Sequence, residues 1–258
     1  MIRKSKVLAK LRAGQVVRVC SVGGFLRYFP RMAAEFGYDA IWVDAEHRVW
    51  DPAEIATMMA LHHLADIDCL WRPATTEKTG LYRLLEDGAS GLMIPHVSTP
   101  HRAQELVQAV KFPPLGDRGL DGSGLDADFW VGKPADYTDL VNRETFLVVQ
   151  IETPQALENV DAIAAVQGVD LLFLGPGDLS LRLGCSSAVD DPVMLDAQRR
   201  LAAAASRHGK AWGRPVGSAG DAQAIVQLGA RLVAWGNDFW AVHQHLAQCA
   251  AGLNAILG

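Results

Sequence analysis

The chain has 258 residues, of which 50% are hydrophobic and 21% are charged. This composition is typical of a globular protein with a large apolar core, and it excludes a disordered or fibrous chain. The formal net charge of -5, with no basic stripe between aromatic residues, argues against nucleic acid and membrane surfaces as partners.

The N-terminal stretch is basic, since several lysines and arginines precede the first acidic residue, Glu35. A targeting peptide would need an apolar core that this stretch lacks. Ile2, Leu8 and Leu11 before Gly14 instead predict a short amphipathic helix with a glycine stop. We expect this helix to cap the bottom of the barrel that the following residues predict.

Eight apolar runs of strand length follow one another along the chain, with helical patterns between them. The runs are near-continuous rather than alternating, as expected for parallel strands that are covered on both faces. They span residues 16–22, 40–43, 69–71, 91–97, 146–151, 171–174, 211–216 and 232–235.

Several of the helical patterns begin with a capping residue followed by proline. Asp51 and Pro52 precede Glu54, which completes a capping box. The same signature recurs at Thr99-Pro100, Thr153-Pro154 and Asp191-Pro192. Each of these pairs predicts that a helix begins directly after a strand or its loop.

The regular alternation of strand and helix predicts parallel pairing, and the number eight favours a closed (β/α)8 TIM barrel. We expect residues 1–258 to form a single barrel domain. An open doubly wound sheet is the alternative, but no G-x-G-x-x-G follows the first strand to indicate dinucleotide binding. One long irregular segment, residues 112–135, is expected at the catalytic face of the barrel.

The four cysteines are scattered and form no C-x-x-C pair. Their spacing favours neither a zinc site nor a disulfide framework, and it fits a reducing, cytoplasmic setting.

Polar residues stand at the carboxyl ends of five successive strands, where the active site of a barrel lies. A structural ion-pair network could account for any two of them, but it explains less well an acid, a base and a guanidinium together. The strand ends read Asp44-Ala45-Glu46-His47, Arg72-Pro73, Pro95-His96, Gln150-Ile151-Glu152-Thr153 and Gly175-Pro176-Gly177-Asp178.

Glu152 and Asp178 follow adjacent strands, so their carboxylates would repel each other in one cleft. A divalent cation would relieve this repulsion, and oxygen ligands suit Mg²⁺ or Mn²⁺, with Co²⁺ as a further candidate. Two protein ligands also leave positions open for a bidentate substrate. For each acid alone, a carboxylate that stabilises a helix N-terminus is the alternative.

The sequence resembles the HpcH/HpaI aldolase family in five places: Asp44-Ala45-Glu46-His47, Arg72-Pro73, the run from Gly88 to Pro95, Gln150-Ile151-Glu152-Thr153 with Ala156-Leu157-Glu158-Asn159, and Gly175-Pro176-Gly177-Asp178-Leu179-Ser180. Members of this family are class II, metal-dependent pyruvate aldolases of the phosphoenolpyruvate/pyruvate barrel superfamily. The resemblance runs from about residue 14 to residue 240. It implies an enzyme that reversibly cleaves 4-hydroxy-2-oxo acids into pyruvate, or hydroxypyruvate, and an aldehyde.

The resemblance also implies residue roles. Glu152 and Asp178 would ligate the metal, Arg72 would contact the enolate oxygen, and His47, oriented by Asp44, would move a proton through a water. An ion-pair role for Arg72 is the structural alternative.

Further substrate contacts are implied around these residues. The backbone at Gly177 and Asp178 would hold the pyruvate carboxylate, and Gln150 would contact the oxo acid on the metal. His96 is placed for substrate contact, with a packing role as an equal alternative. Arg214, where aliphatic residues are expected in the family, predicts a preference for polar or hydroxylated aldehydes.

Two other functions remain open from the sequence. An acyl-CoA lyase of the same superfamily would need a basic nucleotide site, for which no cluster of lysine and arginine is evident. A noncatalytic barrel scaffold explains the fold but not the acid, base and arginine together. The apolar stretch 240–257 could pack on a neighbour, and the resemblance implies a homo-oligomer, a trimer or hexamer, with exchanged C-terminal helices.

Overall fold

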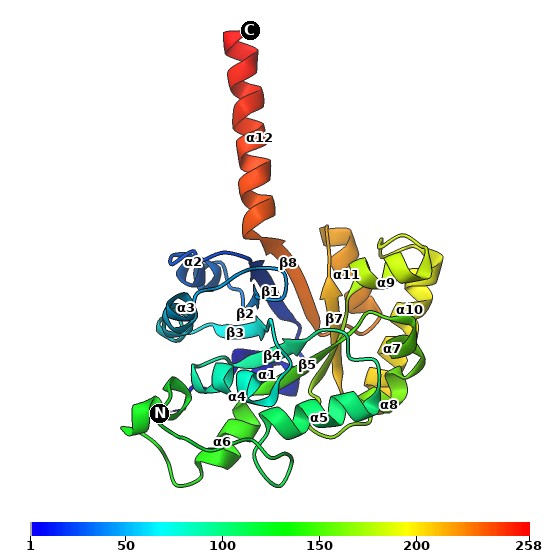
Figure 1. The fold of residues 1–258 in the computed structure, drawn as a ribbon. Helices are drawn as coiled ribbons and strands as arrows, with labels where there is room; N and C mark the ends of the chain where they lie inside the picture. Colours follow the sequence, from blue (N-terminus) through cyan, green and yellow to red (C-terminus); the bar gives the residue numbers. More distant parts are fainter. Residues whose placement is uncertain (1) are drawn as a thin grey trace.

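The protein folds as a closed barrel of eight parallel strands in sequence order, each paired with its neighbours and β8 paired with β1 (Figure 1). The computed structural model describes residues 2–258. It confirms the predicted (β/α)8 barrel over the open sheet. The strands are β1 (Val17–Val22), β2 (Ala40–Asp44), β3 (Asp68–Arg72), β4 (Gly91–Ile94), β5 (Phe146–Ile151), β6 (Leu171–Leu174), β7 (Ala211–Pro215) and β8 (Leu232–Asn237).

Helices cover the outside of the barrel, and the predicted caps are present at their N-termini. Asp51 forms a capping box with Glu54, and the side chains of Thr99, Thr153 and Asp191 accept backbone N–H groups. The helices are α1 (Lys6–Arg12), α2 (Phe29–Glu35), α3 (Pro52–Leu64), α4 (Lys78–Glu86), α5 (Pro100–Val110), α6 (Tyr137–Glu144), α7 (Pro154–Glu158), α8 (Val160–Ala164), α9 (Pro176–Leu183), α10 (Pro192–Arg207), α11 (Ala219–Gln227) and α12 (Asp238–Leu257), with a 3₁₀ turn η1 at Leu125–Trp130.

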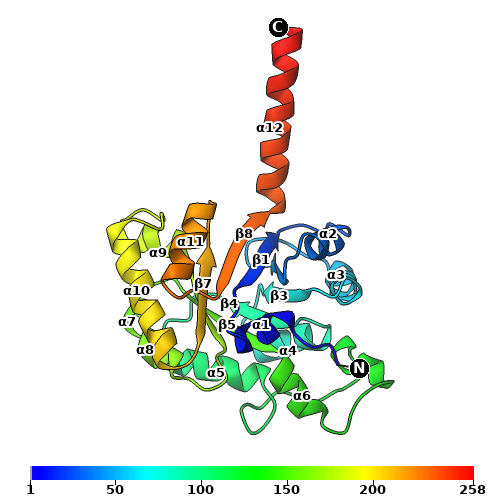
Figure 2. The same ribbon diagram turned by 180° about the vertical axis from the view of Figure 1, so that it is seen from behind.

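The N-terminal helix α1 lies at the bottom of the barrel, opposite the carboxyl ends of the strands (Figure 2). Its Val7 and Leu8 pack into the inner core of the barrel. The buried Asp68 at the start of β3 accepts hydrogen bonds from the Ser5 hydroxyl, at 2.6 Å, and from the Val7 backbone N–H, at 2.9 Å. These contacts fasten α1 in the capping position that its sequence predicted.

Two apolar layers fill the domain. The inner layer contains side chains that point into the barrel, such as Leu70, Met93 and Phe173. The outer layer packs the strands against the helices and includes Trp71, Leu172 and Trp212. Because neighbouring residues of a strand face opposite layers, the side chain of each strand residue points either into the barrel interior or toward the surrounding helices.

The long segment between the fourth and fifth strands does not lie where we expected it. It follows α5 and leads into α6 and β5, so it lies at the amino ends of the strands and not at the catalytic face. Arg118 and Asp126 form a buried ion pair at 2.8 Å, and the Tyr137 hydroxyl also donates to Asp126, at 2.7 Å. The prediction was wrong because α5 begins soon after β4. The long connection therefore comes after α5, at the opposite end of the barrel from the catalytic face.

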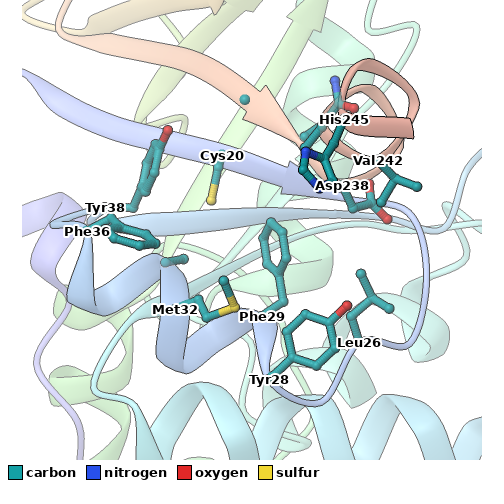
Figure 3. A pocket seen from close by; sticks show the side chains of 14 residues that line it. Cys20, Leu26, Tyr28, Phe29, Met32, Phe36, Tyr38, Asp238, Val242 and His245 are labelled. Atoms are coloured by element: carbon teal, nitrogen blue, oxygen red, sulfur yellow. The ribbon is translucent and has the colours of Figure 1, made fainter. Parts of the chain in front are cut away.

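The last helix, α12, projects away from the barrel in both views (Figures 1 and 2). None of its 20 residues is buried. An apolar groove of about 410 Å³ opens beside its base, between α2 and the outer face of β1 (Figure 3). The groove is lined in part by Cys20, Phe29, Met32, Phe36 and Tyr38. Among the described residues, no helix has the length and hydropathy that crossing a membrane requires.

Candidate functional site

A buried arginine joins the ends of β2 and β3. The Arg72 guanidinium binds Asp44 through Nε, at 2.9 Å, and Nη2, at 2.8 Å, and it binds Glu46 through Nη1, at 2.9 Å. The ring of Trp42 lies 4.6 Å from the guanidinium carbon. Three donors of one planar group are therefore held in fixed directions.

The charge of Arg72 also determines the state of Asp44. Partial burial raises the pKa of Asp44, but the hydrogen bond and the charge of Arg72 outweigh it and hold the pKa below its ordinary value. Asp44 is therefore an ionised carboxylate near neutral pH. We expected Asp44 to orient the His47 side chain. In the structure, Asp44 accepts the backbone N–H of His47, at 3.4 Å, whereas the imidazole Nε2 lies 3.7 Å from Glu46 Oε2.

The carboxylate of Glu152 lies buried at the end of β5. Its Oε1 accepts the backbone N–H of His96, at 2.7 Å, and lies 3.1 Å from the His96 Nδ1. Its Oε2 accepts from Gln150 Nε2, at 3.1 Å. A side chain at Gly175 could not fit, because its Cβ would lie 2.3 Å from the same oxygen. Glu152 is thus enclosed by its neighbours.

His96 connects the two halves of the site. Its Nε2 lies 3.5 Å from Glu46 Oε1, while its Nδ1 faces Glu152. Its backbone has φ +56°, in the left-handed region that is unfavourable for a residue with a Cβ. This conformation directs both its N–H and its ring toward Glu152. Local strain of this kind is often found at functional positions.

Asp178 stands in the first turn of α9, close enough for its charge to act on Glu152. Its carboxylate forms an ion pair with Arg182, one helical turn later, at 2.5 Å. No side chain caps α9, and a Cβ at Gly177 would meet no atom within 4 Å. The first turn of α9 therefore has open space at Gly177, as helix-end anion sites do.

The surroundings of Glu152 suit a cation. Burial raises the pKa of Glu152, and the carboxylates of Glu46 and Asp178 raise it further, against the opposing effect of His96. The Oε1 of Gln150 is buried and accepts no hydrogen bond. Among the described residues, no group of three or more histidine, cysteine or acidic side chains could hold a metal ion. The assignment of Glu152 and Asp178 as metal ligands stays a prediction.

Arg214 does not join this cluster. Its guanidinium is buried behind β7, where Nη1 donates to Gln198 Oε1 at 3.0 Å and Nη2 donates to the Ser187 carbonyl at 2.8 Å. The physical reason is that alternate residues of a strand point to opposite faces. Arg214 points outward like Trp212, while Gly213 points inward. The expected contact between Arg214 and the acceptor aldehyde therefore has no support in the geometry.

Two further residues of the site carried no assigned role in the sequence analysis. Glu46 contacts Arg72 and lies near both histidines, and its signal was its place in the strand-end string with Asp44 and His47. Arg182 pairs with Asp178, and the spacing of four residues on one helix could have indicated it.

The chain is similar to known proteins over most of its length. Residues 19–244 match the family model for HpcH/HpaI aldolase/citrate lyase. The chain is 33% identical to the 2-keto-3-deoxy-L-rhamnonate aldolase of Escherichia coli, over 95% of this chain and 93% of that protein. It is 36% identical to the 5-keto-4-deoxy-D-glucarate aldolase of Shigella boydii, over 78% of each.

The fold has close counterparts among solved structures. The crystal structure of an HpcH/HpaI aldolase from Desulfitobacterium hafniense superposes with a TM-score of 0.88 at 33% identity, over 95% of both chains. These findings confirm the predicted enzyme class, a carbon–carbon lyase. The chain belongs to the HpcH/HpaI aldolase/citrate lyase family.

Proposed function

We propose that the protein is an aldolase that reversibly cleaves 4-hydroxy-2-oxo acids into pyruvate, or hydroxypyruvate, and an aldehyde. The names of its relatives support an aldol cleavage. The observation that carries the proposal is the convergence of a fixed guanidinium, Arg72, and two carboxylates, Glu152 and Asp178, beside an uncapped helix N-terminus.

Glu152 and Asp178 are the residues that would hold a divalent metal, Mg²⁺, Mn²⁺ or Co²⁺. When bound, such a metal supplies positive charge at the 2-oxo group of the substrate. The repulsion among the acids and the unpaired Gln150 Oε1 both support a cation there. Asp178 would have to turn from Arg182 toward Glu152 to serve as a ligand.

Arg72 is the residue that we assign to the enolate. Removal of a proton next to the oxo group, or cleavage of the carbon–carbon bond, leaves negative charge on the oxo oxygen. Asp44 and Glu46 fix the guanidinium in place before the reaction begins. A preorganised donor stabilises this charge without reorganisation, which lowers the barrier.

The N-terminus of α9 is the proposed seat of the substrate carboxylate. The N–H groups of Gly177 and Asp178 belong to a first turn that no side chain caps. The partial positive charge of a helix N-terminus favours an anion there. This contact would orient the oxo acid between α9 and Arg72.

His47 is the proposed acid–base residue. Its imidazole is exposed at the end of β2, and Glu46 is its nearest carboxylate, at 3.7 Å. The ring can therefore reach a water or substrate above the site, while its backbone is held by Asp44. Histidine is suited to proton transfer near neutral pH.

We also propose that the protein is a homo-oligomer held together by α12. This helix has one charged residue, Asp238, and an apolar stripe at Phe239, Val242, Leu246 and Leu253, all exposed. An exposed apolar stripe of this kind indicates an interface. The groove beside α2 and β1 is a matching apolar surface for the α12 of a second copy, in a trimer or hexamer (Figure 3).

The cytoplasm is the proposed location. Cys20, Cys69, Cys185 and Cys249 are all free thiols. Unpaired cysteines fit a reducing compartment.

The first test concerns the metal and the enolate together. With pyruvate and Mn²⁺ in deuterated water, NMR should show loss of the methyl proton signal, because enolate formation exchanges these protons. Exhaustive chelation should abolish this exchange, and Mn²⁺, Mg²⁺ or Co²⁺ should restore it. Full exchange after chelation would contradict the metal assignment to Glu152 and Asp178.

Arg72→Lys keeps the charge but loses the planar fork that binds Asp44 and Glu46. We expect a loss of transition-state stabilisation of about 2–4 kcal/mol, as for single oxyanion donors. The measurements are kcat/KM for cleavage and circular dichroism for folding. Arg102→Lys, in an exposed ion pair with Glu105, is the matched control. Near-normal turnover of a folded Arg72→Lys variant would leave Arg72 a purely structural role.

His47→Ala should slow both methyl exchange and aldol cleavage by about 10²- to 10⁴-fold, because both need the same proton transfer. Mn²⁺ affinity, measured by electron paramagnetic resonance, should not change, since His47 is not a proposed ligand. His101→Ala, on the exposed face of α5, is the control. Retained exchange with lost cleavage would place His47 on the aldehyde side instead.

Leu246→Asp puts a charge into the apolar stripe of α12, so it should lower the oligomeric state of the full chain. Gln248→Asp adds the same charge outside the stripe and should leave assembly intact. Light scattering after size-exclusion chromatography gives the molar mass of each. A monomeric wild-type protein, or equal behaviour of the two variants, would contradict assembly through α12.

A further inference from the structure

Two aromatic rings close the barrel interior beneath the proposed oxo-acid site. Trp42 of β2 and Phe173 of β6 both point inward, and their ring centroids lie 5.6 Å apart in an edge-to-face arrangement. In the closed order of eight strands, β2 and β6 are four strands apart in either direction. The two rings therefore meet across the barrel axis, and we call this pair the aromatic floor.

The Trp42 ring also supports the guanidinium of Arg72. The guanidinium carbon lies over this ring, 4.6 Å from its centroid. Asp44 is paired with Arg72 in the register of β2 and β3, so Trp42 precedes this level by two residues on the same face of β2. The guanidinium thus lies between the aromatic floor and the carboxyl ends of the strands, where the oxo acid is proposed to bind.

The polar contacts of Arg72 fix its guanidinium mainly within one plane. Nε, Nη1 and Nη2 each bind Asp44 or Glu46. Such hydrogen bonds lie in the plane of the guanidinium, so they resist rotation within the plane better than a tilt out of it. A ring against one face opposes the tilt. The direction of the N–H groups that remain for a substrate therefore depends on the contact with Trp42.

The nature of the Trp42 side chain is informative, because its N–H group is not used within the protein. The indole Nε1 is buried and has no hydrogen-bond partner among the residues that the structure describes. Burial of an unpaired N–H costs free energy that a phenylalanine would avoid. Tryptophan, however, attracts a cation more strongly than phenylalanine does. The contact with Arg72 is an interaction that gains from the larger ring.

We infer that Trp42 is a positioning residue of the reaction: with Phe173 against it, its ring keeps the remaining N–H groups of Arg72 directed at the oxo oxygen on which negative charge develops. This inference rests on the proposed aldolase function and adds a residue to it. A donor that is fixed in advance stabilises the developing charge without reorganisation. Since this charge is absent from the bound substrate, loss of the ring should lower kcat more than it raises KM.

The first test follows methyl exchange of pyruvate with Mn²⁺ in deuterated water, which needs enolate formation but no aldehyde. Trp42→Leu should lower kcat by about 2- to 30-fold, the range that a cation–π contact supplies, and Trp42→Phe should keep part of the rate. Trp212→Phe is the matched control and should keep the wild-type rate. Trp212 is also buried with an unpartnered Nε1, but it packs in the outer layer, on the other side of the strands from Arg72.

Fluorinated tryptophan at position 42 alone tests the interaction with little change in the shape of the ring. Each fluorine withdraws electron density from the ring face, so kcat should fall stepwise with the number of fluorines while the melting temperature stays constant. A purely structural role for Trp42 would not produce this series. A rate that is independent of fluorination would overturn the inference, even if the leucine variant failed to fold.

An NMR measurement separates this inference from the proposed function, because it needs no turnover. The order parameter of the Arg72 Nε–H vector, identified by loss of its signal in Arg72→Lys, should be lower in Trp42→Phe than in the wild type. Equal order parameters would overturn the positioning role of Trp42. Absence of methyl exchange in the wild type, with the difference in order parameter intact, would instead count against the aldolase function.

Discussion

The site depends on one shared guanidinium. Arg72 reaches from β3 to the end of β2 and holds Asp44 and Glu46 at hydrogen-bond distance. Glu46 in turn faces His47 and His96, and His96 faces Glu152. These contacts form a continuous series of basic and acidic side chains from β2 to β5. Removal of the guanidinium would leave two carboxylates close together, which is costly in a partly buried position.

The fold was predictable because its signals are local and repeated. Asp51, Thr99, Thr153 and Asp191 each mark a helix start by capping, and the structure has a helix at each of them. Eight apolar runs with such helices between them leave few alternatives to a closed barrel. The long segment after residue 111 was placed at the wrong face, since its composition does not show on which side of a helix it lies.

The site was predictable to the level of strand ends, but not to the level of side-chain direction. Alternate residues of a strand point to opposite faces, so Arg214 of β7 points away from the barrel interior. A shift of one residue along the strand would reverse this direction. Asp178 forms an ion pair with Arg182, and the carboxylate beside the His47 ring is that of Glu46 rather than Asp44. Such choices depend on packing around each side chain, which strand ends alone do not specify.

The exposed helix α12 also bears on how stability must be defined for this protein. A 20-residue helix with no buried residue gains little from the barrel, because most of the stability of helices in proteins comes from the packing of an apolar face. If a second copy covers it, folding of α12 and association become one equilibrium governed by mass action. The melting temperature would then rise with protein concentration, and dilution alone would unfold the C-terminal segment while the barrel persists.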